Sequence, residues 1–418
     1  MGSDTAFTYR NGSLFCEDAS LVDIAARFGT PAYIYSRDAI ASRFCAYRRS
    51  LEGIPHRVCY AVKANSNIAI LQLLASLGAG FDIVSGGELF RVLAAGTDPS
   101  TVVFSGVGKT RDEIDFALAR GIHSFNCESS EELSLLAEIA GRRNVTASVA
   151  LRANPDVDAV THPYISTGLK EHKFGIDISA VESVYRQMAR YPQLTPTGVS
   201  CHIGSQLLSI APLLEAADKM IALVARLRAA GLPIRHLDLG GGLGVTYRPT
   251  EAAAGIDEFI SHLRPRLASA NIELMLEPGR SIVAEAGILL SRVLFEKQNG
   301  SKTFVIVDAG MNDLIRPTLY QAHHEITPVE YSPLPSRVVD IVGPVCETGD
   351  FFARNREIAP LSPGALIAIR TAGAYGFVLA SNYNSRPRPV ELLVTGSEVH
   401  VIRQRETYDD LVRGERLL

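Results

Sequence analysis

The sequence lacks the features that direct a protein to a membrane, to nucleic acid or out of the cell. It has no long block of Lys or Arg, and its formal net charge is −4. This balance argues against nucleic acid or an anionic membrane as the main partner. Residues 1–15 contain no basic segment followed by an apolar one, and no later stretch approaches the ~20 apolar residues of a membrane span. These absences predict a cytoplasmic protein whose partner is a small polar molecule.

The six cysteines show no pairing pattern. They are scattered, with no CxxC pair and no Cys/His spacing suited to zinc. We therefore expect free thiols and no metal site. Cys59 and Cys201 stand among apolar residues of strand type, which predicts small buried hydrophobes.

The composition is that of an ordinary globular protein, with 47% hydrophobic and 21% charged residues, and no internal repeat or low-complexity tract. A chain of 418 residues is too long for one ordinary core, unless a single barrel takes about 250 of them. Between about residues 31 and 280, short β-branched or aromatic runs alternate with longer segments of helical period. The runs are residues 31–36, 57–64, 80–85, 101–106, 123–127, 147–154, 198–204, 236–241 and 273–278.

This alternation fits either a parallel βα barrel of the TIM type or an open, doubly wound sheet. The polar residues favour the barrel, because they follow the ends of several different predicted strands, where a βα barrel gathers its active site. They are Lys63, Asp82, His202, the glycines 240–242 and Glu277. We therefore expect a βα barrel over residues 31–280.

After Arg280 the pattern changes to strand-like runs without long helices between them, separated by turns rich in Pro and Gly. This predicts an all-β domain of the sandwich or Greek-key type over residues 281–418. Residues 7–15 are typical of a hairpin, so residues 1–30 are expected to join the same domain.

Lys63 is the first candidate for chemistry. Its neighbours on both sides are apolar, so the ammonium must lose water, which lowers the pKa of the amine and favours its neutral, nucleophilic form. Schiff-base formation with an aldehyde cofactor needs such an amine. The alternative is a lysine at a strand end whose ammonium reaches water. Both interpretations remain open on this residue alone.

Residues 237–245, LDLGGGLGV, place three glycines directly after an apolar strand, where backbone N–H groups could close on a phosphate. The run does not fit GxGxxG, so a dinucleotide fold gains little from it. Residues 105–110, SGVGKT, resemble the end of a P-loop, but Val103 stands where the first P-loop glycine is needed. We expect that segment to be a turn that opens a helix.

Further polar residues follow other strands. Glu277 and Arg280 could form a structural ion pair. Alternatively, Glu277 could face a pyridine nitrogen and Arg280 could bind a substrate carboxylate. His202 could be a core histidine or an imidazole stacked on a cofactor ring, and the nearby Ser205 could bind phosphate. In the predicted β domain, Gly- and Pro-rich connections carry another set of polar residues, which suits a site on a rigid scaffold: Arg316, Tyr320, Cys346, Glu347 and Tyr375.

Taken together, these motifs resemble one family. They follow in its order over most of the chain, at residues 60–67, 154–176, 202–206, 237–244, 277–280, 308–320, 343–350, 372–377 and 381–391. The family is the pyridoxal-phosphate-dependent decarboxylases of the alanine-racemase-like fold, and within it the diaminopimelate decarboxylases. The resemblance implies a βα barrel followed by a β domain, and a homodimer whose active sites lie between subunits.

The resemblance also implies roles for individual residues. Lys63 would hold pyridoxal 5′-phosphate, His202 would stack on its ring, and Cys346 of the neighbouring subunit would deliver a proton. Further cofactor contacts would be Asp82, Ser205, Gly241, Gly242, Glu277, Gly279, Arg280 and Tyr375. Substrate contacts would be Arg280, Arg316, Tyr320, Glu347 and Tyr375. Thr348 stands where the family often has Ser, a small departure beside Cys346 and Glu347.

The implied reaction is decarboxylation of meso-2,6-diaminopimelate to L-lysine, the last step of lysine biosynthesis. Two arginines and Glu347 suit a substrate with a second ammonium and a second carboxylate. A decarboxylase of ornithine or arginine is the alternative. Those substrates lack the distal carboxylate, so one of the two protein guanidinium groups would have no substrate partner. A racemase would need a second base opposite the lysine. A noncatalytic, barrel-only cofactor-binding protein would have no use for Arg316 and Cys346.

Overall fold

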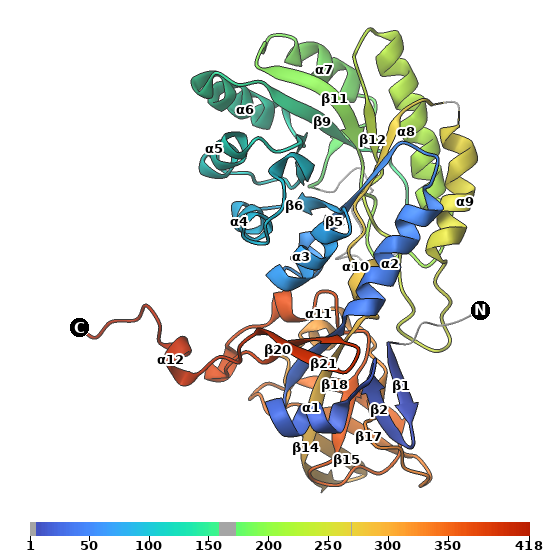
Figure 1. Ribbon diagram of the computed structural model, residues 1–418, viewed down its shortest axis with the longest axis vertical. Coiled ribbons are helices and arrows are strands. Elements are labelled where there is room, and N and C mark those ends of the chain that lie inside the picture. Colours follow the sequence, from blue (N-terminus) through green and yellow to red (C-terminus); the bar gives the residue numbers. More distant parts are fainter. Residues whose placement is uncertain (1–5, 159–172, 269) are drawn as a thin grey trace. The chain divides into compact units, whose positions relative to one another are not determined.

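The computed structural model describes residues 6–158, 173–268 and 270–418, which form two compact units. The barrel unit comprises residues 44–245 and 252–281, and the β unit comprises residues 1–43, 246–251 and 282–418. Helix α2 (Arg37–Ser50) carries the chain from the β unit into the barrel unit. Each unit has its own sheets, so each is described by itself (Figure 1).

Within the described residues, eight parallel strands close into a ring in the barrel unit. In ring order they are β5 (His56–Ala61), β6 (Gly80–Ile83), β7 (Val102–Phe104), β8 (Ser124–Cys127), β9 (Ala147–Asn154), β11 (Leu194–Ser200), β12 (His236–Asp238) and β13 (Glu273–Leu276), which pairs with β5. The short strand β10 (Ile176–Asp177) adds to β9. The predicted TIM-type barrel is confirmed.

Helices follow the strands and lie outside the ring (Figure 1). They are α3 (Ile68–Ser76), α4 (Gly86–Ala94), α5 (Arg111–Arg120), α6 (Ser130–Arg143), α7 (Val181–Met188), α8 (Ala211–Ala229) and α9 (Ile256–Leu267), with 3₁₀ turns η1 (Val62–Ala64) and η2 (Pro99–Thr101). The segment that resembles a P-loop is the turn before α5, as predicted. Its Thr110 forms a capping box with Glu113, and Gly121 ends the helix in a left-handed conformation.

One predicted barrel strand belongs to the other unit. Residues 31–36 do contain a strand, β4 (Ala32–Ser36), but it pairs with β14 (Gly287–Asn299) and β20 (Val390–Thr395) in the β unit. The prediction that this segment is the first barrel strand was wrong. All five residues of β4 are buried, so its two faces are covered just as those of a parallel barrel strand are. The run of apolar residues therefore could not distinguish the two sheets.

The β unit is built around β14. The first half of β14 pairs with β4 and β19 (Leu366–Ile369), and its second half pairs with β15 (Lys302–Val307). The sheet runs in the order β18-β17-β15-β14-β4-β20-β21. Its other strands are β16 (Ile326–Pro328), β17 (Arg337–Val342), β18 (Phe351–Ile358) and β21 (Glu398–Arg403). The predicted β-rich domain is confirmed.

The N-terminal segment completes this unit. Strands β1 (Phe7–Arg10) and β2 (Ser13–Cys16) pair antiparallel, as predicted, and β3 (Ala19–Ser20) pairs with β2. Apolar residues of this small sheet and of α1 (Leu21–Phe28) pack into one core with residues of β4, β14 and β20. The other short helices and 3₁₀ turns are α10 (Arg280–Val283), α11 (Arg316–Tyr320), η3 (Phe377–Leu379), η4 (Tyr383–Ser385) and α12 (Tyr408–Leu411).

All six cysteines lie in the described residues and none forms a disulfide, so the expectation of free thiols is confirmed. Cys59 and Cys201 are buried, also as expected. Among the helices of residues 6–158, 173–268 and 270–418, none has both the length and the apolar character needed to cross a membrane.

Candidate active site

The carboxyl ends of the barrel strands bring the predicted Lys63, Asp82, His202 and Glu277 to one rim, together with polar residues that were not predicted. Because parallel strands in a barrel all point the same way, residues at their carboxyl ends face a common space. The contributors are Lys63 in η1 after β5, Asp82 in β6, Ser105 after β7, Asn126 in β8, Arg152 in β9, His202 after β11, Asp238 in β12 and Glu277 after β13.

Lys63 is paired with Asp82. The distance from Lys63 Nζ to Asp82 Oδ2 is 2.5 Å, and the Asp82 side chain is fully buried whereas that of Lys63 is 33% exposed. The lysine is thus neither enclosed by apolar groups alone nor extended into water, the two alternatives considered from the sequence. A carboxylate at this distance orients the amine and balances its charge.

Two further acids, Asp238 and Glu277, are buried close together. They share one donor, because Asn126 Nδ2 donates to both, at 3.2 Å from Asp238 Oδ2 and 3.3 Å from Glu277 Oε1. Asp238 also accepts from the backbone N–H of Gly240 at 2.8 Å.

Burial raises the pKa of both acids. Burial, followed by the charges of Asp238 and Asp82, holds the pKa of Glu277 well above its usual value, although Lys63 opposes the shift. Burial raises the pKa of Asp238 to about 6. Ionisation of Glu277 is therefore unfavourable in this setting, and a cation placed beside its carboxylate would offset that cost.

A stability measurement checks this electrostatic picture. The folded pKa of Glu277 lies above its unfolded value of 4.5, so ionising it above that pH favours the unfolded chain, and the cost disappears as the pH falls towards 4.5. In protein freed of bound cofactor, Glu277→Gln should raise the free energy of unfolding at pH 8 by about 1 kcal/mol or more, since one pKa unit corresponds to about 1.4 kcal/mol.

The measurement is urea unfolding at several pH values. The matched control is Glu215→Gln at an exposed glutamate paired with Lys219, which should change the stability at pH 8 by less than about 0.5 kcal/mol. A Glu277→Gln protein less stable than wild type at pH 8 would contradict the account.

The glycine run after β12 lets backbone come close to backbone. Gly240 and Gly242 have φ of +67° and +108°, which other residues rarely adopt. A Cβ on Gly241 would lie 2.3 Å from the carbonyl oxygen of Glu277, and one on Gly242 would lie 2.7 Å from that of Gly204. No side chain fits at these positions, so the rim here presents bare peptide groups, as a phosphate cradle requires.

Arg280 and Ser205 meet at the same rim. Arg280 Nη2 donates to Ser205 Oγ at 3.1 Å, and Arg280 is 7% exposed. A guanidinium and a hydroxyl, beside backbone that carries no side chain, offer donors that phosphate prefers. Glu277 can accept a hydrogen bond from a ring N–H, and Lys63 can form a Schiff base with an aldehyde. The residues present therefore fit pyridoxal phosphate.

His202 is held in a neutral form. Its Nδ1 accepts from the backbone N–H of Gly241 at 3.2 Å. Burial, with the charges of Arg152 and Lys63, keeps the pKa of His202 well below its ordinary value. A neutral ring can lie against an aromatic cofactor without placing a further positive charge beside it.

Several residues of this rim were missed from the sequence. Arg152 Nη1 pairs with Glu128 Oε1 at 2.9 Å, and Glu128 also accepts from the backbone N–H of Gly175 at 2.8 Å. Burial raises the pKa of Glu88 to about 7, and its titration is influenced by Lys63 and Asp82. The available signal was a charged or amide side chain inside an otherwise apolar strand, as for Arg152, Asn126 and Asp238.

The remaining predicted residues lie in the β unit. Arg316 begins α11 and Tyr320 ends it, and Thr318 Oγ1 between them donates to the carbonyl of Gly349 at 2.6 Å. This bond joins α11 to the loop 343–350, in which Cys346 and Glu347 are exposed.

Asp350 shapes that loop by accepting from the backbone N–H groups of Met311 and Val345, at 2.6 and 2.7 Å. Tyr375 lies in the same unit, after β19, with a φ of +54° that is unusual for a residue with a side chain. Of the motif at residues 154–176, positions 159–172 lie outside the described residues.

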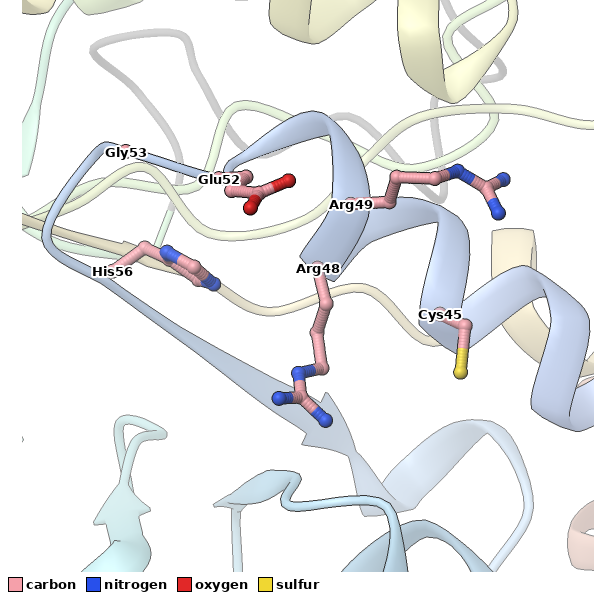
Figure 2. Close-up of a pocket in the computed structure, with 6 residues that line it drawn as sticks. All are labelled: Cys45, Arg48, Arg49, Glu52, Gly53 and His56. Atoms are coloured by element: carbon pink, nitrogen blue, oxygen red, sulfur yellow. The ribbon is translucent and has the colours of Figure 1, made fainter.

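A separate pocket opens at the other end of the barrel strands. It is lined by residues of the second half of α2, the loop that follows and the start of β5. Figure 2 shows the guanidinium groups of Arg48 and Arg49 pointing in different directions, with Glu52 nearby. The pocket lies at the amino end of β5, whereas Lys63 follows its carboxyl end, so it is not part of the candidate site.

Comparison with known proteins first gives the class. Residues 37–284 match a family profile described as the pyridoxal-dependent decarboxylase, pyridoxal binding domain. The matched range contains all the rim residues described above. A closed βα barrel with this rim, carrying that domain, defines a pyridoxal-dependent decarboxylase.

The relatives define the family. The chain is 56% identical to the diaminopimelate decarboxylase of Pseudomonas aeruginosa over 99% of both chains. Among solved structures, the Helicobacter pylori diaminopimelate decarboxylase complexed with L-lysine has a TM-score of 0.90 and 44% identity, covering 94% of this chain and 98% of that one. The M. jannaschii diaminopimelate decarboxylase in co-complex with L-lysine has a TM-score of 0.94 and 37% identity, covering 99% and 98%. The protein belongs to the diaminopimelate decarboxylase family.

Proposed function

We propose that the protein converts meso-2,6-diaminopimelate to L-lysine and carbon dioxide, the last step of lysine biosynthesis, with pyridoxal 5′-phosphate held on Lys63. The observation that carries the proposal is the identity of 56% over 99% of the chain with a relative named for this activity. The site supports it independently, because the amine, the buried acid pair and the glycine run fit the cofactor. When bound, pyridoxal phosphate supplies an electron sink for the charge left as carbon dioxide departs.

The barrel residues hold and orient the cofactor in this proposal. Asp82 keeps the Lys63 amine in place, Glu277 as a carboxylate would accept from the ring nitrogen, and His202 would lie against the ring. Backbone at the glycine positions and polar side chains would hold the phosphate and so orient the cofactor. These are Ser205, Gly241, Gly242, Gly279, Arg280 and Tyr375.

Substrate selection follows from charge. The substrate carries two ammonium and two carboxylate groups. The half that does not react therefore needs an anionic partner for its ammonium and a cationic partner for its carboxylate. Glu347 pairs with the distal ammonium, and Arg316, with Arg280, pairs with carboxylate. Tyr320 and Tyr375 add hydroxyl groups to the same set. Ornithine and arginine have no distal carboxylate and would leave a guanidinium unpaired.

Cys346 delivers the proton that replaces the lost carboxylate. The thiol is exposed and free, and a positioned acid typically contributes 10²- to 10⁴-fold to a proton transfer. A racemase would instead need a base that removes a proton from the face opposite Lys63. A barrel-only, noncatalytic cofactor-binding protein would need neither Cys346 nor Arg316.

Product analysis tests the reaction. Protein loaded with pyridoxal phosphate and incubated with meso-2,6-diaminopimelate should yield lysine and carbon dioxide in equal amounts. Carbon dioxide without lysine, or a stereochemical change without carbon dioxide, would show a different reaction.

We further propose that the protein works in the cytoplasm as a homodimer and binds neither nucleic acid nor membrane. The β unit would contribute substrate-binding and dimer-interface residues, and each active site would combine Lys63 of one subunit with Cys346 of its partner. The resemblance of the loop 343–350 to the family's motif supports this arrangement.

Subunit mixing checks the shared site. Lys63→Ala and Cys346→Ala proteins, each inactive alone, are unfolded together and refolded. A mixed dimer has one site with both native residues, so random mixing should restore about one quarter of wild-type activity. Verified mixed dimers that stay inactive would show that the two residues belong to the same subunit's site.

A further inference from the structure

Arg316 sits in a defined setting within the β unit, formed by Tyr247 and His324. The guanidinium carbon of Arg316 lies 4.9 Å from the centre of the Tyr247 ring, so the cation stacks on the aromatic face. Arg316 Nε donates to His324 Nε2 at 3.3 Å. The rings of Tyr247 and His324 meet edge to face, with centres 5.3 Å apart. The three residues, here called the Arg316 cluster, are 5%, 8% and 0% exposed.

His324 is held in place by groups other than Arg316. Its Nδ1 lies 2.8 Å from the carbonyl oxygen of Arg370, and its own carbonyl accepts from Arg356 Nη2 at 3.1 Å. With Nδ1 donating to a carbonyl, Nε2 carries the lone pair that receives Arg316 Nε–H. The imidazole is therefore a fixed acceptor, and Arg316 is aligned against it.

Tyr247 reaches this cluster from a different part of the chain. Residues 246–251 belong to the β unit, although the residues on both sides of them belong to the barrel unit. Tyr247 thus supplies a flat, largely buried surface for Arg316 from a segment that no β-unit strand contains. The stacking restrains the plane of the guanidinium, and the bond to His324 restrains its rotation within that plane.

We propose that Tyr247 and His324 are positioning residues that hold Arg316 for the distal carboxylate of the substrate and so set the preference for amino acids with a second carboxylate. This inference rests on the proposed function, in which Arg316 binds that group. Paired bonds to a carboxylate use the planar fork of an arginine, and their strength depends on its orientation. The contacts to Tyr247 and His324 engage one face and Nε, and neither contact uses the Nη atoms.

The proposal separates ligands by the carboxylate that they keep. Decarboxylation removes the carboxylate at the reacting carbon, so the product L-lysine retains the distal one. Pentane-1,5-diamine keeps both amines of L-lysine and the five carbons that join them, but it has no carboxylate. Loss of the positioning residues should therefore weaken the binding of substrate and of L-lysine, and leave the binding of pentane-1,5-diamine unchanged.

The test measures the kcat and KM of the loaded enzyme for meso-2,6-diaminopimelate, and the inhibition constants and calorimetric affinities of L-lysine and pentane-1,5-diamine. For Tyr247→Leu and His324→Phe we expect KM and the L-lysine inhibition constant to rise about tenfold, the size of a lost cation–π contact or a lost bond to a charged group. The kcat should fall by less than about threefold, because binding is lost rather than a transition-state contact.

Controls separate positioning from general damage. Tyr247→Phe keeps the ring face and should bring KM back to within about twofold of wild type. Tyr331→Leu, at a tyrosine that is 68% exposed in the same unit, should change neither constant. Thermal unfolding of each variant establishes that it is folded, and Tyr247→Leu keeps the test available where His324→Phe does not fold.

The outcomes are distinct. A folded Tyr247→Leu protein with unchanged KM overturns the inference, and so does an equal loss for all three ligands, which would indicate general damage to the site. A wild-type protein that does not decarboxylate meso-2,6-diaminopimelate overturns the proposed function instead.

Discussion

Replacing Lys63 by alanine is expected to abolish the visible absorbance of the purified protein and to lower decarboxylation by at least about a thousandfold, the scale of losing a covalent catalytic group. Without the amine, no Schiff base with pyridoxal phosphate can form. The change also leaves the buried Asp82 carboxylate without the ammonium that lies 2.5 Å from it in the wild-type protein. Lys63→Ala therefore removes a nucleophile and a charge at once.

Two further variants separate those effects. Lys63→Arg keeps a cation beside Asp82 but cannot form a Schiff base at neutral pH, so it should be as stable as wild type and as colourless as Lys63→Ala. Lys219→Ala removes a partly exposed lysine that pairs with Glu215 and should keep both absorbance and activity. Borohydride reduction followed by peptide mapping identifies the modified lysine. A chromophore that survives in Lys63→Ala and maps to another lysine would contradict the assignment.

Replacing Cys346 by alanine is expected to lower kcat by about 10²- to 10⁴-fold, the usual contribution of a positioned acid. KM for meso-2,6-diaminopimelate should change by less than about threefold, because the thiol acts on the reacting carbon after binding. Steady-state kinetics with separate kcat and KM values is the measurement.

Cys45→Ala is the matched control, since Cys45 is also a free and partly accessible thiol, and it should leave both constants unchanged. An unchanged kcat in Cys346→Ala would remove the proposed proton donor.

Much of the fold could be predicted from the sequence because barrel strands are buried on both faces. Every residue of β7, a Val-Val-Phe run, is buried, and short runs of this kind were recognised. The segment at residues 31–36 shows the limit of this reasoning. Strand β4 is equally buried but lies between β14 and β20, and only the pairing of distant segments distinguishes a barrel strand from a central strand of another sheet.

The site was predictable where its residues follow a strand and less so where they lie within one. Lys63, His202 and Glu277 come directly after apolar runs, in motifs that stand out from their surroundings. Asp238 and Asn126 lie inside β12 and β8, and side chains of a strand alternate between its two faces. Which face looks into the barrel is known only once the ring is closed, so the acid pair and its shared amide donor could not be foreseen.

The same limit explains the Arg316 cluster. Arg316 was recognised from its motif, but Tyr247 lies 69 positions earlier in a segment surrounded by barrel residues. No pattern in the sequence connects a tyrosine after the glycine run with an arginine in the β unit. Their contact arises only in the tertiary structure. In our proposal, substrate selection therefore depends on residues outside the family's motifs.

The central claim is that this pyridoxal-dependent enzyme acts on an amino acid with two charged ends. The most direct test measures carbon dioxide release by the loaded enzyme from meso-2,6-diaminopimelate, ornithine and arginine, each as kcat/KM. We expect the kcat/KM for meso-2,6-diaminopimelate to exceed those for the other two by at least about a hundredfold. With ornithine or arginine as substrate, the buried guanidinium of Arg316 would lack its substrate carboxylate, and losing one partner of a buried charge pair costs several kcal/mol. A kcat/KM for ornithine or arginine equal to or above that for meso-2,6-diaminopimelate would contradict the account.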